Sequence, residues 1–339
     1  MAPWPDVRAR RRIAAWSAAV VAASCALAGC SAPAAPGPAT SVASPSATAS
    51  STPPAPASTP PASTAAREAP NSPEPSEQAS ASCPLPQTGF DCDLQRRIVA
   101  ADAYARSRPG TTGFVVRDRQ TGAVYRNGFA GTAVWTASTI KLAMTIALER
   151  WNDAGTIRLS TSNRNDIAAM LHSSDDDAAD RLWYEYADTG LTPGAAPHTA
   201  YNAVFASFGM THLQPQSGFS KYQPYWGFQE CTPADLDALD QYLLTEVPAA
   251  ERADIVTALQ HVDPDQQWGV WGAGASAVPG NKDGWSQEAS GWVMNSVGFV
   301  GPGQRYTLAM MNSLNGEGGY DTGRATVTQV AATLFAGRF

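Results

Sequence analysis

Strand-like segments stand at both ends of residues 83–339, with helix-like segments between them, and this arrangement most constrains the fold. The strand-like segments are short and carry β-branched and aromatic residues. They are residues 113–118, 123–126, 277–282, 292–300 and 306–312. Strands so far apart in the chain bury their apolar faces by pairing beside the helices. The prediction is an α/β fold of the α+β kind, in which N- and C-terminal segments form one antiparallel sheet, flanked by helices, with an inserted all-helical subdomain.

Apolar residues recur at helical spacing from residue 93 to residue 108 and in later segments. The later predicted helices are residues 138–151, 164–171, 177–187, 200–208, 233–244, 249–261 and 324–336. A helix that begins at Ser138 places this hydroxyl at the positive end of the helix dipole, near free backbone N–H groups.

The first 29 residues are predicted to be a secretory signal, because four arginines precede an apolar stretch too short to span a membrane comfortably. The stretch ends Leu27-Ala28-Gly29-Cys30, which resembles the lipobox of bacterial lipoproteins, where the cysteine is acylated and becomes the mature N-terminus. We therefore predict a lipid anchor at Cys30. A plain signal peptide and twin-arginine export stay open as alternatives.

Residues 30–82 are predicted to be a disordered linker behind this lipid anchor. From residue 31 on they are almost wholly Ala, Pro, Ser and Thr, with one valine and no aromatic residue, so they cannot bury a core. Such a stalk reaches between roughly 40 and roughly 160 Å. The expected location is the outer face of the bacterial cell membrane, with the folded domain held away from the lipid.

The net charge indicates which partners to expect, and the cysteines indicate a disulfide. The formal charge is −7, and it becomes −10 once the four Arg and one Asp of residues 1–29 are removed. Such a surface argues against nucleic acid. In an exported chain Cys83 and Cys92, which bracket a short loop, are predicted to form a disulfide. Cys231 would then be free, although its pairing with either of them stays open.

Lysine is rare in this chain, with three among 23 basic residues, and two of the three stand in motifs. Lys141 closes Ser138-Thr139-Ile140-Lys141, and Lys282 opens Lys282-Asp283-Gly284. A buried lysine can lose its proton, whereas arginine cannot. One helical turn separates Lys141 from Ser138, so a neutral amine could take the serine proton. The alternative is a helix-capping serine with an exposed lysine.

The order of three motifs favours the catalytic interpretation of Ser138 and Lys141 more strongly than the first motif alone does. Ser174-Asp175-Asp176 lies 36 residues after Ser138, and Lys282 lies another 108 residues on. This order resembles the penicillin-recognising serine enzymes, specifically class A β-lactamases and their envelope relatives, which carry Ser-x-x-Lys, Ser-Asp-Asn and Lys-Thr-Gly. Residues 135–142 and 174–180 also look like the family's segments. The resemblance covers residues 93–339 and implies a β-lactamase-like serine hydrolase domain over residues 83–339.

The resemblance also implies roles for site residues. Ser138 would be the nucleophile and Lys141 its base, while Ser174 would pass a proton to the leaving group and Lys282 would supply positive potential. Substrate would lie against Asp176, Asp283, Gly284 and Trp285, with the backbone N–H groups of Ser138 and Trp285 as the oxyanion hole. The alternatives are that Ser174 only caps a helix and that Lys282 is an ordinary strand-end charge.

Two motif residues depart from the family pattern. Asp176 replaces an asparagine, so it can only accept hydrogen bonds, and its charge would raise the pKa of Lys141. Asp283 replaces a threonine or serine that helps bind a substrate carboxylate. If it faces the site ionised, it repels that group by roughly 4 kcal/mol at about 4 Å and a dielectric of about 20; if it points away, it does not.

The loop after the second motif lacks the family's hydrolytic glutamate. Residues 189–229 contain no Asp or Glu, and Glu230 is the first acid. Without a base to activate water an acyl-enzyme persists, so we expect a poor β-lactamase. The loop is aromatic, with Lys221 beside Tyr222, Tyr225, Trp226 and Phe228, which indicates core packing or a lid over substrate.

The sequence therefore predicts a membrane-anchored serine hydrolase that forms an acyl-enzyme at Ser138. Its partner would be a cell-wall-derived amide or ester, or a β-lactam-like small molecule that reacts slowly. No cofactor is implied, and the four histidines show no metal-site spacing. The alternative function is a degenerate binding or scaffolding module of the cell envelope. The altered second and third motifs favour that alternative, whereas retention of Ser138, Lys141, Ser174 and Lys282 favours the enzyme.

Overall fold

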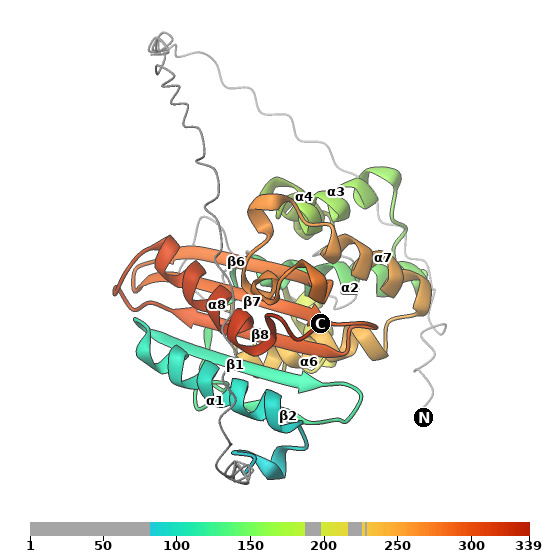
Figure 1. Ribbon diagram of the computed structural model, residues 1–339. Coiled ribbons are helices and arrows are strands. Elements are labelled where there is room, and N and C mark those ends of the chain that lie inside the picture. Colours follow the sequence, from blue (N-terminus) through green and yellow to red (C-terminus); the bar gives the residue numbers. More distant parts are fainter. Residues whose placement is uncertain (1–81, 187–197, 216–225, 228) are drawn as a thin grey trace, which may run out of the picture. The chain divides into compact units, whose positions relative to one another are not determined.

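A computed structural model describes residues 82–186, 198–215, 226–227 and 229–339 (Figure 1). The predicted signal, Cys30 and nearly all of the linker lie outside these residues. The helices are α1 Cys92–Ser107, α2 Ile140–Asp153, α3 Thr161–His172, α4 Asp176–Tyr186, α5 His198–Ser207, α6 Pro233–Thr245, α7 Ala249–Gln260 and α8 Tyr320–Phe335. Within the described part of the chain no helix is long and apolar enough to cross a bilayer.

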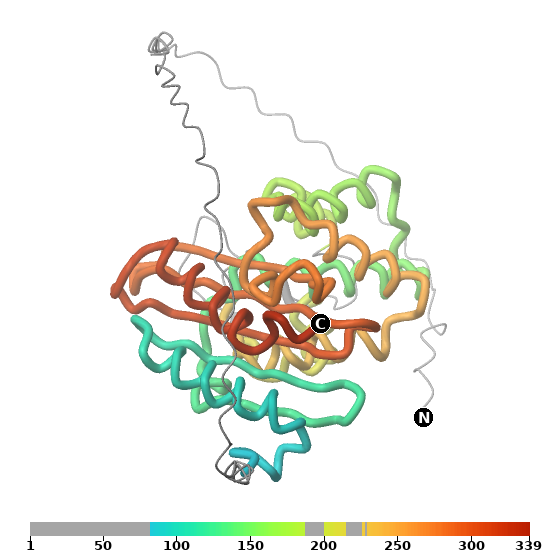
Figure 2. Tube along the Cα trace, in the orientation of Figure 1, coloured from blue at the N-terminus to red at the C-terminus, as the bar shows by residue number. Residues whose placement is uncertain are grey.

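One five-stranded antiparallel sheet forms the centre of the domain. Its strands are β1 Thr111–Asp118, β2 Val124–Arg126, β6 Gly280–Glu288, β7 Gly291–Val300 and β8 Tyr306–Ser313. They lie in the order β2-β1-β8-β7-β6, with Val115 of β1 opposite Ala309 of β8. The tube in Figure 2 shows the N-terminal strand beside the C-terminal ones. The predicted closure of the sheet by distant segments is confirmed.

Alternation along the strands gives the sheet two apolar faces. Leu308 and Met310 pack with α1 and α8 on one face, whereas Ala309 and Met311 face the helical part of the domain. α1 and α8 cover the first face in Figure 1, and α6 lies behind the sheet. The second face therefore carries the helical part of the domain, which includes α2 and α6.

Local signals fix where several helices begin. Ser160 and Asn163 form a capping box at the start of α3, and Thr232 and Asp235 form another at the start of α6. A second sheet was not predicted, and it consists of β3 Val134–Trp135, β4 Gln214–Pro215 and β5 Gln229–Cys231 in the order β3-β5-β4. Strands of two or three residues are too short for their periodicity to be read.

The predicted strand over residues 277–282 is wrong in its bounds. A 3₁₀ turn occupies Ala275–Ala277, and Val278 has a left-handed φ of +48°, so extended backbone starts only at Gly280. The strand then continues to Glu288, because every residue from Gly280 to Glu288 pairs with β7. The third motif consequently lies inside a paired strand.

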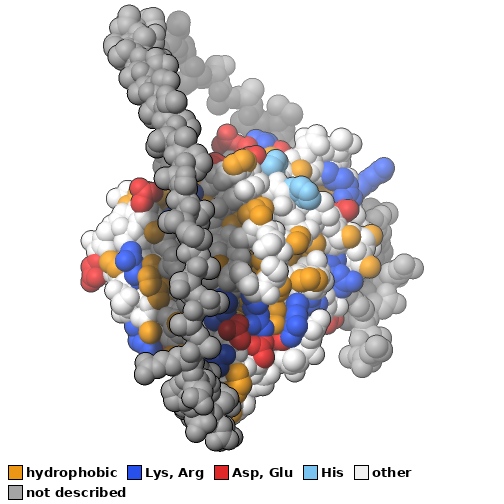
Figure 3. Space-filling model, viewed as in Figure 1, with side chains coloured by type: hydrophobic (Ala, Val, Ile, Leu, Met, Phe, Trp, Pro, Cys, Tyr) orange, Lys and Arg blue, Asp and Glu red, His pale blue; other side chains and the backbone are white. Residues whose placement is uncertain are grey.

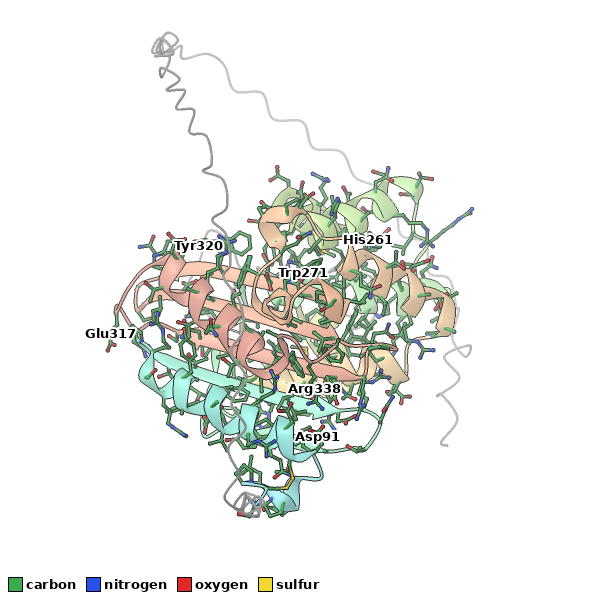
Figure 4. All side chains as sticks on the ribbon, viewed as in Figure 1. Asp91, His261, Trp271, Glu317, Tyr320 and Arg338 are labelled. Carbon is green, nitrogen blue, oxygen red and sulfur yellow. A yellow bond between two sulfur atoms is a disulfide. The ribbon has the colours of Figure 1, made fainter. Side chains whose placement is uncertain are left out.

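The two ends of the described chain are tied to the domain. Figure 4 shows Arg338 and Asp91 pointing toward each other, and an ion pair joins them. Cys83 and Cys92 form a disulfide that closes the segment before α1. Cys231 is a free, buried thiol in β5. On the face seen in Figure 3, acidic and basic side chains are interspersed.

Replacing both Cys83 and Cys92 by serine should lower the free energy of unfolding by about 2–3 kcal/mol, because a loop of this length no longer constrains the unfolded chain. Urea unfolding followed by tryptophan fluorescence measures this. Reduction of the wild type should give the same loss. An unchanged midpoint in both experiments would contradict a stabilising disulfide.

Candidate active site

Ser138 lies in a strained turn at the entrance to α2. The turn is the 3₁₀ segment η2 Ala137–Thr139, so Ser138 precedes α2 and is not its first residue. Ala137 has a φ of +44°, which a residue with a Cβ rarely adopts. Strain of this kind persists only where the surroundings enforce it. The Ser138 side chain is largely buried, with 8% of the residue exposed.

Strands β6 and β7 hold this turn in place. The Asn295 amide on β7 donates hydrogen bonds to the carbonyls of Trp135, at 2.7 Å, and Thr136, at 3.2 Å. A Cβ on Gly284 of β6 would lie only 2.9 Å from the Ser138 backbone nitrogen and 2.7 Å from that of Thr139. Only glycine therefore lets the third motif approach the first so closely.

The Lys141 amine is fully buried and contacts the second motif. Its Nζ donates to the Ser174 carbonyl at 2.6 Å and to Asp176 Oδ1 at 2.5 Å. The Ser174 hydroxyl is farther away, at 3.5 Å, and the Trp226 ring centroid lies 4.5 Å from Nζ. Among the described residues no hydrogen bond joins Lys141 to the Ser138 hydroxyl. The alternative of an exposed lysine is wrong.

Ser174 stands between the two motif lysines. It adopts a left-handed φ of +60°, and its hydroxyl accepts a hydrogen bond from Lys282 Nζ at 2.9 Å. The capping role at α4 belongs to Asp175, whose carboxylate accepts from the Ala178 N–H at 2.7 Å. The alternative that Ser174 merely caps a helix is therefore wrong, because its hydroxyl is turned toward the lysines.

Lys282 is the third residue of β6 and is almost fully buried, with 1% exposed. Besides Ser174, its Nζ contacts the backbone carbonyl of Asp283 at 2.8 Å. It is therefore no ordinary strand-end charge. The three motifs, distant in sequence, meet at the Ser174 hydroxyl.

Burial lowers the pKa of both site lysines, because an ammonium loses its hydration there. For Lys141 the Asp176 carboxylate opposes this shift through its charge and its hydrogen bond. The pKa of Lys282 falls to about 7 through burial and through repulsion by Lys141. The predicted effect of Asp176 on Lys141 is present, but burial outweighs it. Two amines with perturbed pKa values in one site indicate a functional location.

Asp283 points away from the lysines, because alternation along β6 turns its side chain to the opposite face of the sheet. It lies there opposite Ser296 of β7, beneath the 3₁₀ segment η4 Gly269–Ala273. Both carboxyl oxygens are buried and make no hydrogen bond within the described chain. Burial raises the pKa of Asp283 to about 8, and the nearby polar side chains of Ser296 and Asn281 and the charge of Lys282 offset this rise only in part. Repulsion of a substrate carboxylate requires an ionised group that faces the site. Asp283 faces the other side of the sheet and its pKa is raised, so this repulsion is not expected.

Gly284 and Trp285 have different parts in the site. Gly284 permits the contact with Ser138, whereas the Trp285 ring lies on the Asp283 side, 6.1 Å from Trp268 and 6.0 Å from Tyr320 between ring centroids. Only the backbone of Trp285 can face the turn that holds Ser138.

The loop after the second motif is described only in part. Lys221, Tyr222, Tyr225 and Phe228 lie outside the described residues. Trp226 is buried, contacts Lys141 through its ring and donates from its indole N–H to Asp180 at 2.7 Å. It therefore packs in the core and also covers a site amine. Glu230 lies in β5 opposite Trp135, and burial raises its pKa.

Sequence reasoning missed two contributors to the site, the anchoring role of Asn295 and the cover over Lys141 by Trp226. An asparagine inside an apolar strand was the available signal for Asn295, since a buried amide needs partners. In the described part of the chain no group of three or more His, Cys, Asp or Glu side chains could hold a metal ion.

Comparisons with known proteins establish the fold. No family model matches the chain. LppW of Mycobacterium tuberculosis and of Mycobacterium bovis, whose name describes a candidate lipoprotein, is 27% identical over 259 residues, 74% of this chain and 77% of the relative.

Among solved structures, a β-lactamase from Burkholderia vietnamiensis is similar with a TM-score of 0.56 and 17% identity, over 71% of this chain and 94% of its own. An ancestral class A β-lactamase and PBP-A each give a TM-score of 0.55 and 18% identity, over 71% of this chain and 98% and 94% of their own. The predicted β-lactamase-like fold is confirmed.

Replacing Asp283 by asparagine should stabilise the protein, increasingly as pH rises from about 4.5 to about 6.5. The folded protein keeps the Asp283 proton up to about pH 8, whereas the unfolded chain releases it near the ordinary value of 3.8. The wild type therefore loses up to about 1.4 kcal/mol per pH unit in this window, and the amide does not. Urea unfolding of both proteins across the window measures the difference. Parallel curves would show that Asp283 titrates in its ordinary range when folded.

Proposed function

We propose that this protein is an exported, lipid-anchored serine hydrolase that forms an acyl-enzyme at Ser138. The substrate would be an amide or ester of the cell envelope, with β-lactams as slow alternatives. One observation carries the proposal: Ser138 lies on a strained turn three residues before the buried Lys141, and Lys141 and the buried Lys282 both contact the Ser174 hydroxyl. A merely structural site has no need of two desolvated amines around one alcohol.

The reaction would run as acyl transfer. Ser138 Oγ attacks the substrate carbonyl carbon while its proton passes to a neutral lysine amine, which the sequence-based assignment takes to be Lys141. The carbonyl oxygen becomes an oxyanion held by the backbone N–H groups of Ser138 and Trp285. Collapse restores the C=O bond and breaks the bond to the leaving group, which receives the proton through Ser174.

Hydrolysis of the acyl-enzyme should be slow. Residues 189–229 offer no carboxylate to activate water, and the first acid, Glu230, is tied into β5. A nucleophile without a matched deacylation base gives a long-lived adduct. The site therefore suits acylation better than rapid turnover of β-lactams.

The proposed location depends on the N-terminal segment. Cys30 follows a lipobox-like sequence, and the similarity to LppW, which is named as a candidate lipoprotein, supports a lipid anchor. Residues 30–82 would then act as a stalk that places the domain within the cell envelope, on the outer side of the membrane.

A second candidate function is a binding or scaffolding module that has lost turnover. The contact that favours it is the ion pair between Lys141 and Asp176, because this amine makes no hydrogen bond to the Ser138 hydroxyl among the described residues. Such a protein would keep the fold and the site residues and bind envelope fragments without reacting.

Labelling separates the two functions. The full chain in detergent micelles is treated with a fluorescent penicillin or with a fluorophosphonate, and intact mass is measured. We expect a single adduct that Ser138→Ala abolishes. Ser174→Ala should slow labelling by about 10²–10⁴-fold, because proton transfer loses its relay. The matched control is Ser173→Ala, since Ser173 is the exposed neighbour that contacts only the Ala169 carbonyl among the described residues.

Each labelling outcome has a defined meaning. A persistent penicillin adduct at Ser138 supports a penicillin-binding or slow hydrolase role, and a phosphonate adduct alone supports another acyl substrate. Absence of any adduct with both reagents contradicts the enzyme and leaves the binding module.

A further inference from the structure

We propose that Lys282, and not Lys141, is the terminal acceptor of the Ser138 proton, reached through the Ser174 hydroxyl. The inference rests on the proposed function, in that it presumes an acyl transfer at Ser138. It exchanges the roles that the motif resemblance implies for the two lysines, so that Lys141 supplies the fixed positive charge and Lys282 supplies the base.

The contacts of Lys141 favour its charged form. An ammonium can donate three hydrogen bonds, and this one meets a carboxylate oxygen at 2.5 Å and a backbone carbonyl at 2.6 Å. The face of the Trp226 ring, 4.5 Å away, attracts a cation as well. Asp175 and Asp180 add further negative charge nearby. Deprotonation of Lys141 would remove the charge on which the ion pair with Asp176 and the attraction to the Trp226 ring depend, and would weaken both hydrogen bonds.

Lys282 lacks such support. Its amine contacts only neutral oxygens in the described residues, those of the Ser174 hydroxyl and the Asp283 carbonyl, and no carboxylate there lies within 4.0 Å. The charged groups that act on its pKa are Lys141 on α2, which lowers it by repulsion, and the carboxyls of Asp283 and Asp176, which raise it less. Asp176, on α4, forms its ion pair with Lys141. The carboxyl of its own strand neighbour, Asp283, lies on the other face of the sheet.

Two ammonium groups that share one buried hydroxyl repel each other, so one of them should give up its proton first. Lys282, the ammonium without an anionic partner, loses the least interaction energy when it is deprotonated. The pKa of Lys282, lowered to about 7 by burial and by Lys141, agrees with this order. Lys282 is therefore poised to exchange a proton near neutral pH.

The neutral Lys282 amine takes the Ser174 proton as Ser174 takes the proton of Ser138, and the freed Ser138 oxygen bonds to the acyl carbon. On collapse of the oxyanion, Lys282 returns the proton through Ser174 to the departing nitrogen or oxygen. In the described residues no hydrogen bond yet joins the two hydroxyls, and such catalytic contacts commonly tighten when substrate binds.

The scarcity of lysine makes the proposal directly measurable. A full chain labelled with ¹³C at lysine Cε gives signals for three residues only, Lys141, Lys221 and Lys282. Lys221→Arg and Lys282→Arg assign them. We expect the Lys282 signal to titrate with a midpoint of about 7, below that of Lys141. Asp176→Asn should lower the Lys141 midpoint by about one unit or more, whereas Asp177→Asn, the exposed neighbour on α4, should leave it in place.

The outcome that would overturn the proposal is a Lys141 midpoint below that of Lys282. If Lys282→Arg does not fold, Asp176→Asn still identifies the Lys141 signal by its shift. Labelling of Ser138 gives the second readout: its rate should rise about tenfold from about pH 6 to about pH 8 and fall at least about 100-fold in Lys282→Arg. If Ser138 is labelled but the Lys141 midpoint lies below that of Lys282, only the assignment of Lys282 as the base is contradicted. If Ser138 is not labelled at all, the proposed function itself is contradicted.

Discussion

The close approach of β6 to the turn before α2 is the constraint on which the site depends. Because Gly284 has no side chain, the strand lies against the backbone nitrogens of Ser138 and Thr139. Asn295 on the neighbouring strand holds the carbonyls just before them. These contacts join the C-terminal strands to the start of the helical part, and they keep Ala137 in a conformation that it would not adopt alone.

Desolvation then gives the site its chemistry. Both lysines are buried and contact one serine hydroxyl, and the carboxylate of Asp176 forms an ion pair with Lys141. Because the carboxylate contacts Lys141 and not Lys282, the two amines are electrostatically different although they look alike in sequence. A replacement that seems to disable the second motif, aspartate for asparagine, therefore also determines which amine can be neutral.

The sequence predicted the antiparallel sheet closed by distant strands, because strand patterns at both ends of the domain leave few other arrangements. It also singled out the residues that meet at Ser174, through the rarity of lysine and the order of the motifs. It could not place Asp283, because the predicted strand ended at Lys282 and strand alternation was therefore not applied to the next residue, whereas β6 continues to Glu288. The contact of Lys141 with Asp176 could not be predicted either, because a contact between residues 35 positions apart depends on packing.

A crystal structure of the protein after reaction with a fluorophosphonate would show whether Ser138 is the nucleophile and which groups hold the oxyanion. We expect phosphorus bonded to Ser138 Oγ, a phosphonyl oxygen within hydrogen-bond distance of the backbone N–H groups of Ser138 and Trp285, and Lys282 Nζ still in contact with Ser174. An adduct on another residue, or a phosphonyl oxygen directed away from β6, would contradict it.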